Sequence, residues 1–280
     1  MAASMKIIFG LLTFVTVGMI IGISHWWNYK EAEILRLGHV QPEIISWSPR
    51  IIVLHNFLSM ESIMSNSSCN KLRECHDGYV ALRDDNEYFD NLQECDYLRA
   101  LAKPRLQVST VVDTKTGKGV KSNVRTSSGM FLSSSERKYS TVQAIEKRIA
   151  VYSQVPSENG ELIQVLRYDK GEFYKAHHDY FSDTFNIQRG GQRVATMLMY
   201  LSDNVEGGET YFPMAGSGEC SCGGKLMQGL SVKPIKGDAV LFWSMGLDGQ
   251  SDPKSIHGGC EVLSGEKWSA TKWMRQKSGS

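Results

Sequence analysis

Residues 173–181 read FYKAHHDYF, and they decide how the rest of this chain is interpreted. Side chains alternate between the two faces of a strand, so we expect His177 and Asp179 on one face and His178 on the other. An H-x-D pair alone is a weak signal, because such pairs also serve as structural hydrogen-bonded contacts. A metal site would need a further ligand from elsewhere in the chain.

That ligand is expected from residues 255–259, which read SIHGG. His257 lies beside glycines, which allow close approach of a neighbouring backbone. Two histidines and one carboxylate on one face of an octahedral ion leave three positions open, as in the non-haem Fe(II) oxygenases. We therefore expect His177, Asp179 and His257 to bind iron.

Lys267 is the candidate anion-binding residue, within the β-rich segment 265–273, GEKWSATKW. A lysine inside a barrel is costly to bury unless it meets an anion. A diacid that ligates iron through one end would present its far carboxylate there. The alternative is an ordinary surface lysine.

Short β-rich runs separated by Gly and Asp turns dominate the chain, at residues 44–47, 51–57, 106–112, 162–168, 194–201, 230–232 and 239–243. Helical spacing of apolar residues predicts helices at 94–101 and 140–153. Many short strands with few helices predict a mostly β fold, a β-sandwich or jelly roll supported by helices on one side.

Composition excludes several classes of protein. The chain has 280 residues, of which 41% are hydrophobic and 22% charged, as in ordinary globular proteins. A net charge of +1 provides no long-range field to attract nucleic acid, so we expect no nucleic-acid partner. Six cysteines are too few for a disulfide scaffold, and none of their spacings forms a C-x-x-C zinc motif.

An apolar stretch at residues 7–23 predicts an N-terminal transmembrane helix. As a helix it would rise about 25 Å, which barely spans a thin bilayer such as that of the endoplasmic reticulum. Trp26 and Trp27 follow where an interfacial aromatic belt would lie. We expect a signal anchor at residues 1–27 with the remainder lumenal. The alternative is a cleaved signal peptide, because residues 22–24 place small side chains at the positions that signal peptidase inspects.

A lumenal stem at residues 28–43 and a folded domain at 44–277 are expected to follow, with an insertion at 62–93. If the insertion is removed on paper, residues 59–61 and Glu94 read S-M-E-E, a capping box directly before a helix. Asn66 within the insertion begins an N-x-S/T sequon, which is either glycosylated or unused.

Together, the motif Y-x-x-H-x-D at residues 174–179, His257 and the pair KW at 267–268 resemble the prolyl 4-hydroxylases of the 2-oxoglutarate dioxygenases, especially the small monomeric forms of plants. The resemblance covers residues 49–277 apart from the insertion. It implies a double-stranded β-helix core that binds Fe(II), 2-oxoglutarate, O2 and L-ascorbate. It also implies that Lys267, assisted by Tyr168 and Thr210, holds the C5 carboxylate of 2-oxoglutarate.

The resemblance further implies that the chain converts peptidyl proline to 4-hydroxyproline in secreted or cell-wall proline-rich proteins, giving succinate and CO2. The enzyme itself would be located in the endoplasmic reticulum or Golgi. Such peptides adopt the polyproline II conformation and dock on aromatic surfaces. Candidate substrate contacts are Arg193, Arg125, Ser127, Tyr180 and Trp268. For Arg193, a role in a structural salt bridge is an equally good explanation. For the aromatic residues, the alternative is packing in the core. Residues 124–129 and 182–186 resemble mobile substrate covers.

Cysteine pairing would accompany a lumenal location. Cys220 or Cys222 would pair with Cys260 beside the site, and Cys69 with Cys75 in the insertion, because oxidising compartments permit such bridges.

Two other functions remain open. One is a 2-oxoglutarate oxygenase with another substrate. The other is a catalytically impaired splice or gene-model variant that acts only as a binding protein, because the insertion interrupts a helix.

Overall fold

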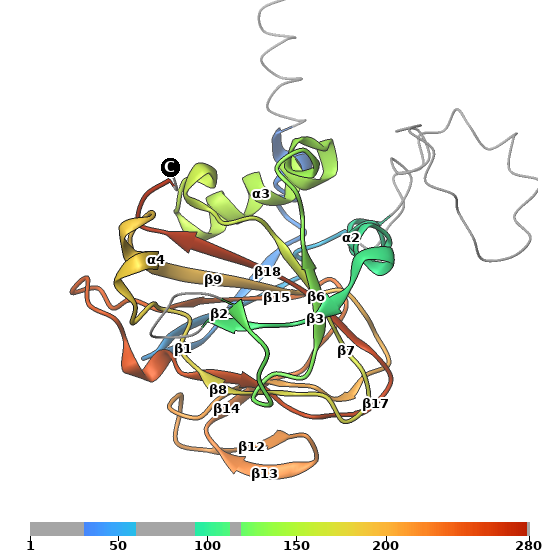
Figure 1. Ribbon diagram of the computed structural model, residues 1–280, viewed down its shortest axis with the longest axis vertical. Helices are drawn as coiled ribbons and strands as arrows, with labels where there is room; N and C mark the ends of the chain where they lie inside the picture. The colour runs from blue at the N-terminus through green and yellow to red at the C-terminus, as the bar shows by residue number, and fades with distance from the viewer. Residues whose placement is uncertain (1–30, 60–92, 113–118, 279–280) are drawn as a thin grey trace, which may run out of the picture.

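The computed structural model describes residues 31–59, 93–112 and 119–278 (Figure 1). The expected anchor at 1–27, the sequon at Asn66 and the pair Cys69 and Cys75 lie outside these residues, as does nearly all of the expected insertion. Within the described ranges, no helix has the length and apolar character needed to cross a membrane.

An eight-stranded antiparallel sheet forms the centre of the fold, in the order β1-β2-β15-β9-β18-β7-β6-β3. In this order its strands are Gln41–Trp47, Arg50–His55, Ala239–Trp243, Arg193–Tyr200, Lys267–Arg275, Gln164–Tyr168, Ser128–Phe131 and Gln107–Val108. The central strands β15 and β9 are mostly buried, which explains their nearly continuous apolar sequences.

A smaller four-stranded sheet, in the order β14-β11-β16-β8, contains two of the expected metal ligands. Its strands are Leu230–Val232, Thr210–Phe212, His257–Gly259 and Tyr174–His177. Three short two-stranded pairs complete the β structure: β10 (Glu206–Gly207) with β17 (Val262–Ser264), β12 (Glu219–Cys222) with β13 (Lys225–Gln228), and β4 (Val111–Val112) with β5 (Gly119–Val120). The described chain is therefore mostly β, consistent with the expected jelly-roll core.

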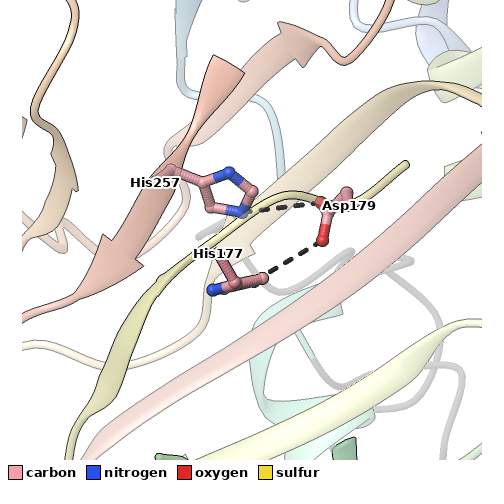
Figure 2. Close-up of side chains that lie close together, drawn as sticks. All are labelled: His177, Asp179 and His257. Carbon is pink, nitrogen blue, oxygen red and sulfur yellow. Dashed lines mark ion pairs between the residues drawn. The ribbon is translucent and has the colours of Figure 1, made fainter. Parts of the chain in front are cut away.

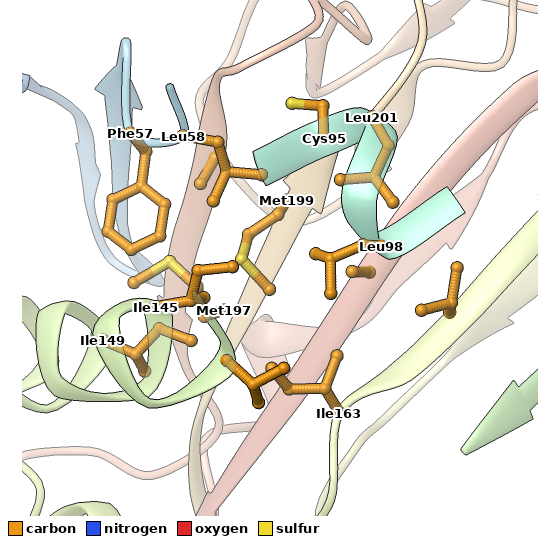
Figure 3. Close-up of a cluster of buried hydrophobic side chains, with 14 of the residues drawn as sticks. Phe57, Leu58, Cys95, Leu98, Ile145, Ile149, Ile163, Met197, Met199 and Leu201 are labelled. Carbon is orange, nitrogen blue, oxygen red and sulfur yellow. The ribbon is translucent and has the colours of Figure 1, made fainter. Parts of the chain in front are cut away.

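Helices α2 (Glu94–Ala102) and α3 (Ser140–Ser153) cover one face of the large sheet (Figure 1). Their inward side chains, such as Leu98 and Ile145, pack against Met197 and Met199 of β9 (Figure 3). Further helical turns are α4 (Thr184–Gln188), η2 (Lys103–Arg105), η3 (Glu136–Lys138), η4 (Ser157–Asn159) and η5 (Pro253–Ser255), and residues 31–34 are also helical. The main apolar core thus lies on the helix side of the large sheet.

Ser59 and Glu94 form the reciprocal hydrogen bonds expected of a capping box. The Ser59 backbone N–H donates to Glu94 Oε2 (2.8 Å), and the Glu94 N–H donates to Ser59 Oγ (3.3 Å). Arg148 of α3 is almost fully buried and donates to both Glu94 oxygens, at 2.8 and 2.9 Å. The chain segments before and after residues 60–92 are therefore held next to each other by the contacts between Ser59 and Glu94.

The sequence predictions agree with several elements and fail at others. Helix α3 and strands β14 and β15 have the predicted bounds. The predicted run 106–112 instead forms two strands, because β3 pairs with β6 while β4 pairs with β5. Contacts with the domain also begin before residue 44, since β1 starts at Gln41 and Leu35 and Val40 are already buried.

Deletion of residues 62–93 tests whether the insertion contributes to the stability of the fold. We expect the shortened chain to be as stable as the full chain, or more stable by about 1–2 kcal/mol, because a long loop no longer has to be closed. The measurement is urea-induced unfolding. Glu94→Ala in the shortened chain should cost about 3–5 kcal/mol, because Arg148 loses its buried partner. A lower urea midpoint after the deletion would contradict this account.

Candidate active site

Antiparallel pairing of β8 with β16 places His177 directly opposite His257. Strand β8 ends at His177, so Asp179 lies just beyond the strand, but His177 and Asp179 face the same cavity and His178 does not, as expected. Asp179 nevertheless turns back toward both rings (Figure 2). Its Oδ1 lies 3.5 Å from His177 Nε2, and its Oδ2 lies 3.5 Å from His257 Nε2. The three potential ligand atoms lie within 4.8 Å of one another.

Backbone carbonyls fix the tautomer of both imidazoles. His177 Nδ1 lies 2.9 Å from Lys175 O, and His257 Nδ1 lies 2.9 Å from Ser255 O. A carbonyl oxygen can only accept a hydrogen bond, so each Nδ1 carries the proton. Each Nε2 therefore directs a lone pair toward Asp179, as a metal ion requires. The donor set and its tautomers fit a divalent ion of the Fe(II) type.

Asp179 is an ionised carboxylate in a buried position. Burial opposes its ionisation, but the positive charges that His257 and His177 carry when they are protonated, together with the Arg193 guanidinium, outweigh burial and hold the pKa of Asp179 well below its usual range. Thr196 Oγ1 also donates to its Oδ2 at 2.6 Å. Burial lowers the pKa of His257 to about 4, so this ring is neutral and available as a ligand at physiological pH.

The three residues line a cavity between the two sheets, together with alternate residues of β18. Positions 267, 269, 271 and 273 all face it, as the alternation of a strand requires. The cavity wall from the other strands and adjoining segments consists of Arg125, Leu166, Tyr168, Tyr174, Thr196, Leu198, Thr210, Phe242, Gly258 and Gly259. The expected cosubstrate residues Lys267, Tyr168 and Thr210 therefore share one cavity with the metal ligands.

Lys267 is a buried cation, only 3% exposed. Its Nζ lies 5.3 Å from the centre of the Tyr168 ring and makes no salt bridge within the described residues. Burial lowers the pKa of Lys267 to about 8, and the Glu209 carboxylate offsets only part of this effect. An anion entering the cavity would supply the missing partner.

Tyr174 contacts the metal ligands directly. Its ring stacks on His177 with centroids 3.7 Å apart, and the Arg125 guanidinium lies 4.8 Å from the ring centre on the cavity wall. Burial raises the pKa of Tyr174 to about 12, so its hydroxyl stays protonated. Ser127 Oγ accepts a hydrogen bond from Arg125 Nε (3.2 Å), so Ser127 supports the cavity wall through Arg125.

The other expected substrate contacts lie outside the cavity lining. Arg193 forms two hydrogen bonds with Glu161, at 2.8 and 2.7 Å, as the salt-bridge alternative describes. Trp268 is buried in the main apolar cluster, because it faces the opposite side of β18 from Lys267. Tyr180 contacts His178, with ring centroids 4.6 Å apart and the ring planes tilted by 32°.

Several cavity residues were not identified from the sequence, and Thr196 and Trp273 are the two that matter most for the site. Strand alternation counted from Lys267 would have identified Trp273, since both have odd numbers on β18. Thr196 carried no comparable signal, because its role depends on Asp179 approaching from another part of the chain.

A disulfide between Cys222 and Cys260 fastens hairpin β12–β13 to the residue that follows β16. This confirms that one cysteine of the pair Cys220 and Cys222 bonds Cys260, while Cys220 and Cys95 stay free. Glu209 holds the same hairpin by accepting hydrogen bonds from Ser221 Oγ (3.1 Å) and Gly223 N–H (3.0 Å). The strand that carries His257 is thereby braced from outside.

Comparison with known proteins gives matches that agree with this geometry. The sequence model of the 2OG-Fe(II) oxygenase superfamily matches residues 163–275, which include His177, Asp179, His257 and Lys267. Prolyl 4-hydroxylase 1 of Arabidopsis thaliana is 62% identical over the full length of both chains. Probable prolyl 4-hydroxylase 3 of the same plant is 48% identical over 83% of this chain and 71% of its own.

Among solved structures, the viral collagen prolyl hydroxylase of Paramecium Bursaria Chlorella virus-1 is similar, with 27% identity and a TM-score of 0.48. The match covers 65% of this chain and 89% of the viral one.

Replacement of a single ligand should abolish metal binding without unfolding the chain. We expect His257→Ala to lose measurable Mn(II) binding in calorimetry, because two donors cannot hold the ion in this geometry. His39→Ala, at an exposed position, is the matched control and should bind as the unaltered chain does. Undiminished Mn(II) affinity in a folded His257→Ala protein would show that the metal centre is not at this position.

The pKa of Lys267 predicts how cosubstrate affinity depends on pH. Below about pH 8 the amine is protonated and attracts a carboxylate, whereas above it the free protein loses the charge. The dissociation constant of 2-oxoglutarate, measured by calorimetry on Mn(II)-loaded protein, should therefore rise about tenfold per pH unit above 8. Lys267→Arg keeps its charge throughout and should remove this slope. Equal slopes in both proteins would contradict the assignment.

Proposed function

Because this chain belongs to the prolyl 4-hydroxylases of the 2OG-Fe(II) oxygenase superfamily, we propose that it acts on extended proline-rich segments of secreted or cell-wall proteins. The observation that carries the proposal is the convergence of two imidazole Nε2 atoms and one carboxylate in a cavity that also contains a buried lysine, which has no salt-bridge partner among the described residues.

Within the cavity, His177, Asp179 and His257 would hold Fe(II). With 2-oxoglutarate and O2, the bound ion supplies the oxidation that converts proline to 4-hydroxyproline and 2-oxoglutarate to succinate and CO2. Lys267 would meet the C5 carboxylate of 2-oxoglutarate as its counter-ion, with Tyr168 and Thr210 beside it. L-Ascorbate is the proposed reductant that keeps the iron ferrous.

The chain's own residues would position the peptide and exclude water. Leu166 and Phe242 make part of the cavity wall apolar. Tyr174, protonated and stacked on His177, contributes a hydrogen-bond donor to the cavity wall. Arg125 is held in place by Ser127 and by Gln164 Oε1 (3.2 Å). Fixed groups of this kind favour one orientation of the proline ring.

Binding of the peptide at the cavity would depend on its conformation. A polyproline II segment has a low ordering cost and docks readily on aromatic side chains. Trp273 and Tyr174 lie in the cavity wall and are better placed for this role than Tyr180 or Trp268. Arg193 would act through the ring of Trp273, which its guanidinium faces at 4.0 Å.

The proposed compartment is the lumen of the endoplasmic reticulum or Golgi, with residues 1–27 as a single-pass type II anchor. The apolar stretch at residues 7–23 supports the anchor. The disulfide between Cys222 and Cys260 supports an oxidising compartment. Asn66 would then be accessible to glycosylation. A cleaved signal peptide would lead to the same compartment without the anchor.

The deciding experiment is a mass-spectrometric assay of the purified full chain with Fe(II), 2-oxoglutarate and ascorbate. We expect a proline-rich peptide to gain the mass of one oxygen atom, and no gain when Fe(II) or 2-oxoglutarate is withheld. Lysine-containing peptides and nucleic acid are the comparison substrates. Succinate release on either of these, with none on the proline peptide, would identify an oxygenase of another class. Activity only after deletion of residues 62–93 would identify an impaired variant.

A further inference from the structure

The residues that follow the apolar stretch are fastened to helix α3. The Glu31 carboxylate forms an ion pair with Lys147 Nζ (2.5 Å). Arg148 donates to the Ile34 carbonyl oxygen at 3.1 and 2.8 Å, and the side chain of Leu35 is only 8% exposed. Residues 31–40, here called the strap, are therefore part of the folded domain.

The strap leaves very little chain between the domain and the proposed membrane anchor. Trp27, at the expected aromatic belt, is separated from Glu31 by residues 28–30 alone. Fully extended, the link from Trp27 to Glu31 reaches about 14 Å. A domain attached through so short a link cannot move far from the bilayer surface.

The side of α3 that adjoins the strap has a surface compatible with lipid headgroups. Ser140, Gln143, Lys147 and Val151 are exposed at intervals of three or four residues and so lie along one side of the helix. The single carboxylate of α3, Glu146, is buried and bonded to Lys272. The strap adds two exposed side chains to this surface, the apolar Leu37, which is 54% exposed, and the acidic Glu33. Because the surface is nearly neutral, the inference rests on the short link rather than on charge.

Figure 1 shows α3 and the strap at the upper end of the molecule, with β8, β12 and β13 at the lower end. The candidate metal ligands belong to β8, β16 and the segment after β8, on the side of the small sheet. The strap and the cavity are thus on different sides of the large sheet.

We infer that the face formed by α3 and the strap lies on the lumenal surface of the membrane that residues 7–23 cross, and that the catalytic cavity faces away from it. This arrangement rests on the anchor proposed above. It selects substrates by position: prolines in the free lumen reach the cavity, whereas prolines directly beside the membrane do not.

Fluorescence quenching of the full chain in phosphatidylcholine nanodiscs tests the arrangement. A genetically encoded coumarin amino acid is placed either at Val151, on the outer side of α3, or at Leu226, which is 70% exposed on β13. The nanodiscs also contain lipids that carry a TEMPO nitroxide quencher on the headgroup. We expect quenching at position 151 to be several-fold larger than at position 226.

A lengthened link provides the matched control. Insertion of 20 Gly and Ser residues between Tyr29 and Lys30 gives a flexible chain of roughly 25 Å average reach, so the quenching at position 151 should fall to the level at position 226. Proline hydroxylation of a soluble peptide should not change, because the insertion lies outside the cavity. Persistent quenching with the long link would overturn the role assigned to the short one.

The failures can be told apart. If the chain stays with the nanodisc but both positions are quenched equally or not at all, the orientation is wrong and the anchor is right. If the chain does not stay with the nanodisc, both the anchor and the orientation are wrong. Neither result changes the conclusion about the catalytic cavity, which the peptide assay measures separately.

Discussion

The register between strands β8 and β16 is the constraint on which the rest of the structure depends. It pairs His177 with His257 across the small sheet, and a slip by one residue would turn one ring to the other face. The brace around β16 preserves this register. Cys260 is bonded covalently to Cys222, and its N–H donates to Glu209 O of the neighbouring segment at 2.9 Å. The chemistry of the site therefore depends on a covalently fastened strand.

Buried charge explains why the cavity fits a metal ion and a diacid together. Asp179 is a buried anion beside the two imidazoles, whereas Lys267 is a buried cation with no salt-bridge partner among the described residues. Each group would be costly to bury alone. A metal cation beside Asp179 and a carboxylate beside Lys267 would compensate both charges. A chelating diacid with one end at the metal and the other at the lysine meets this requirement with a single molecule.

Much of this arrangement could be predicted from the sequence, because local periodicity determines it. Helix α3 and strand β15 follow from the spacing of apolar residues, and the bonds between Ser59 and Glu94 follow from a capping pattern that is split in the sequence. Contacts made in three dimensions were harder to predict. Alternation correctly directed His177 and Asp179 to one side, although strand β8 ends before Asp179. The sequence analysis names Trp268 as a substrate contact and does not name Trp273, although alternation from Lys267 directs Trp273 to the cavity and Trp268 to the core.

The most direct test of the central claim is anomalous diffraction from crystals of the chain grown without oxygen with Fe(II) and 2-oxoglutarate. The account predicts one iron peak within bonding distance of His177 Nε2, His257 Nε2 and an oxygen of Asp179. It also predicts density for the far carboxylate of 2-oxoglutarate against Lys267 Nζ. An iron peak elsewhere, or 2-oxoglutarate bound with its far carboxylate away from Lys267, would contradict it.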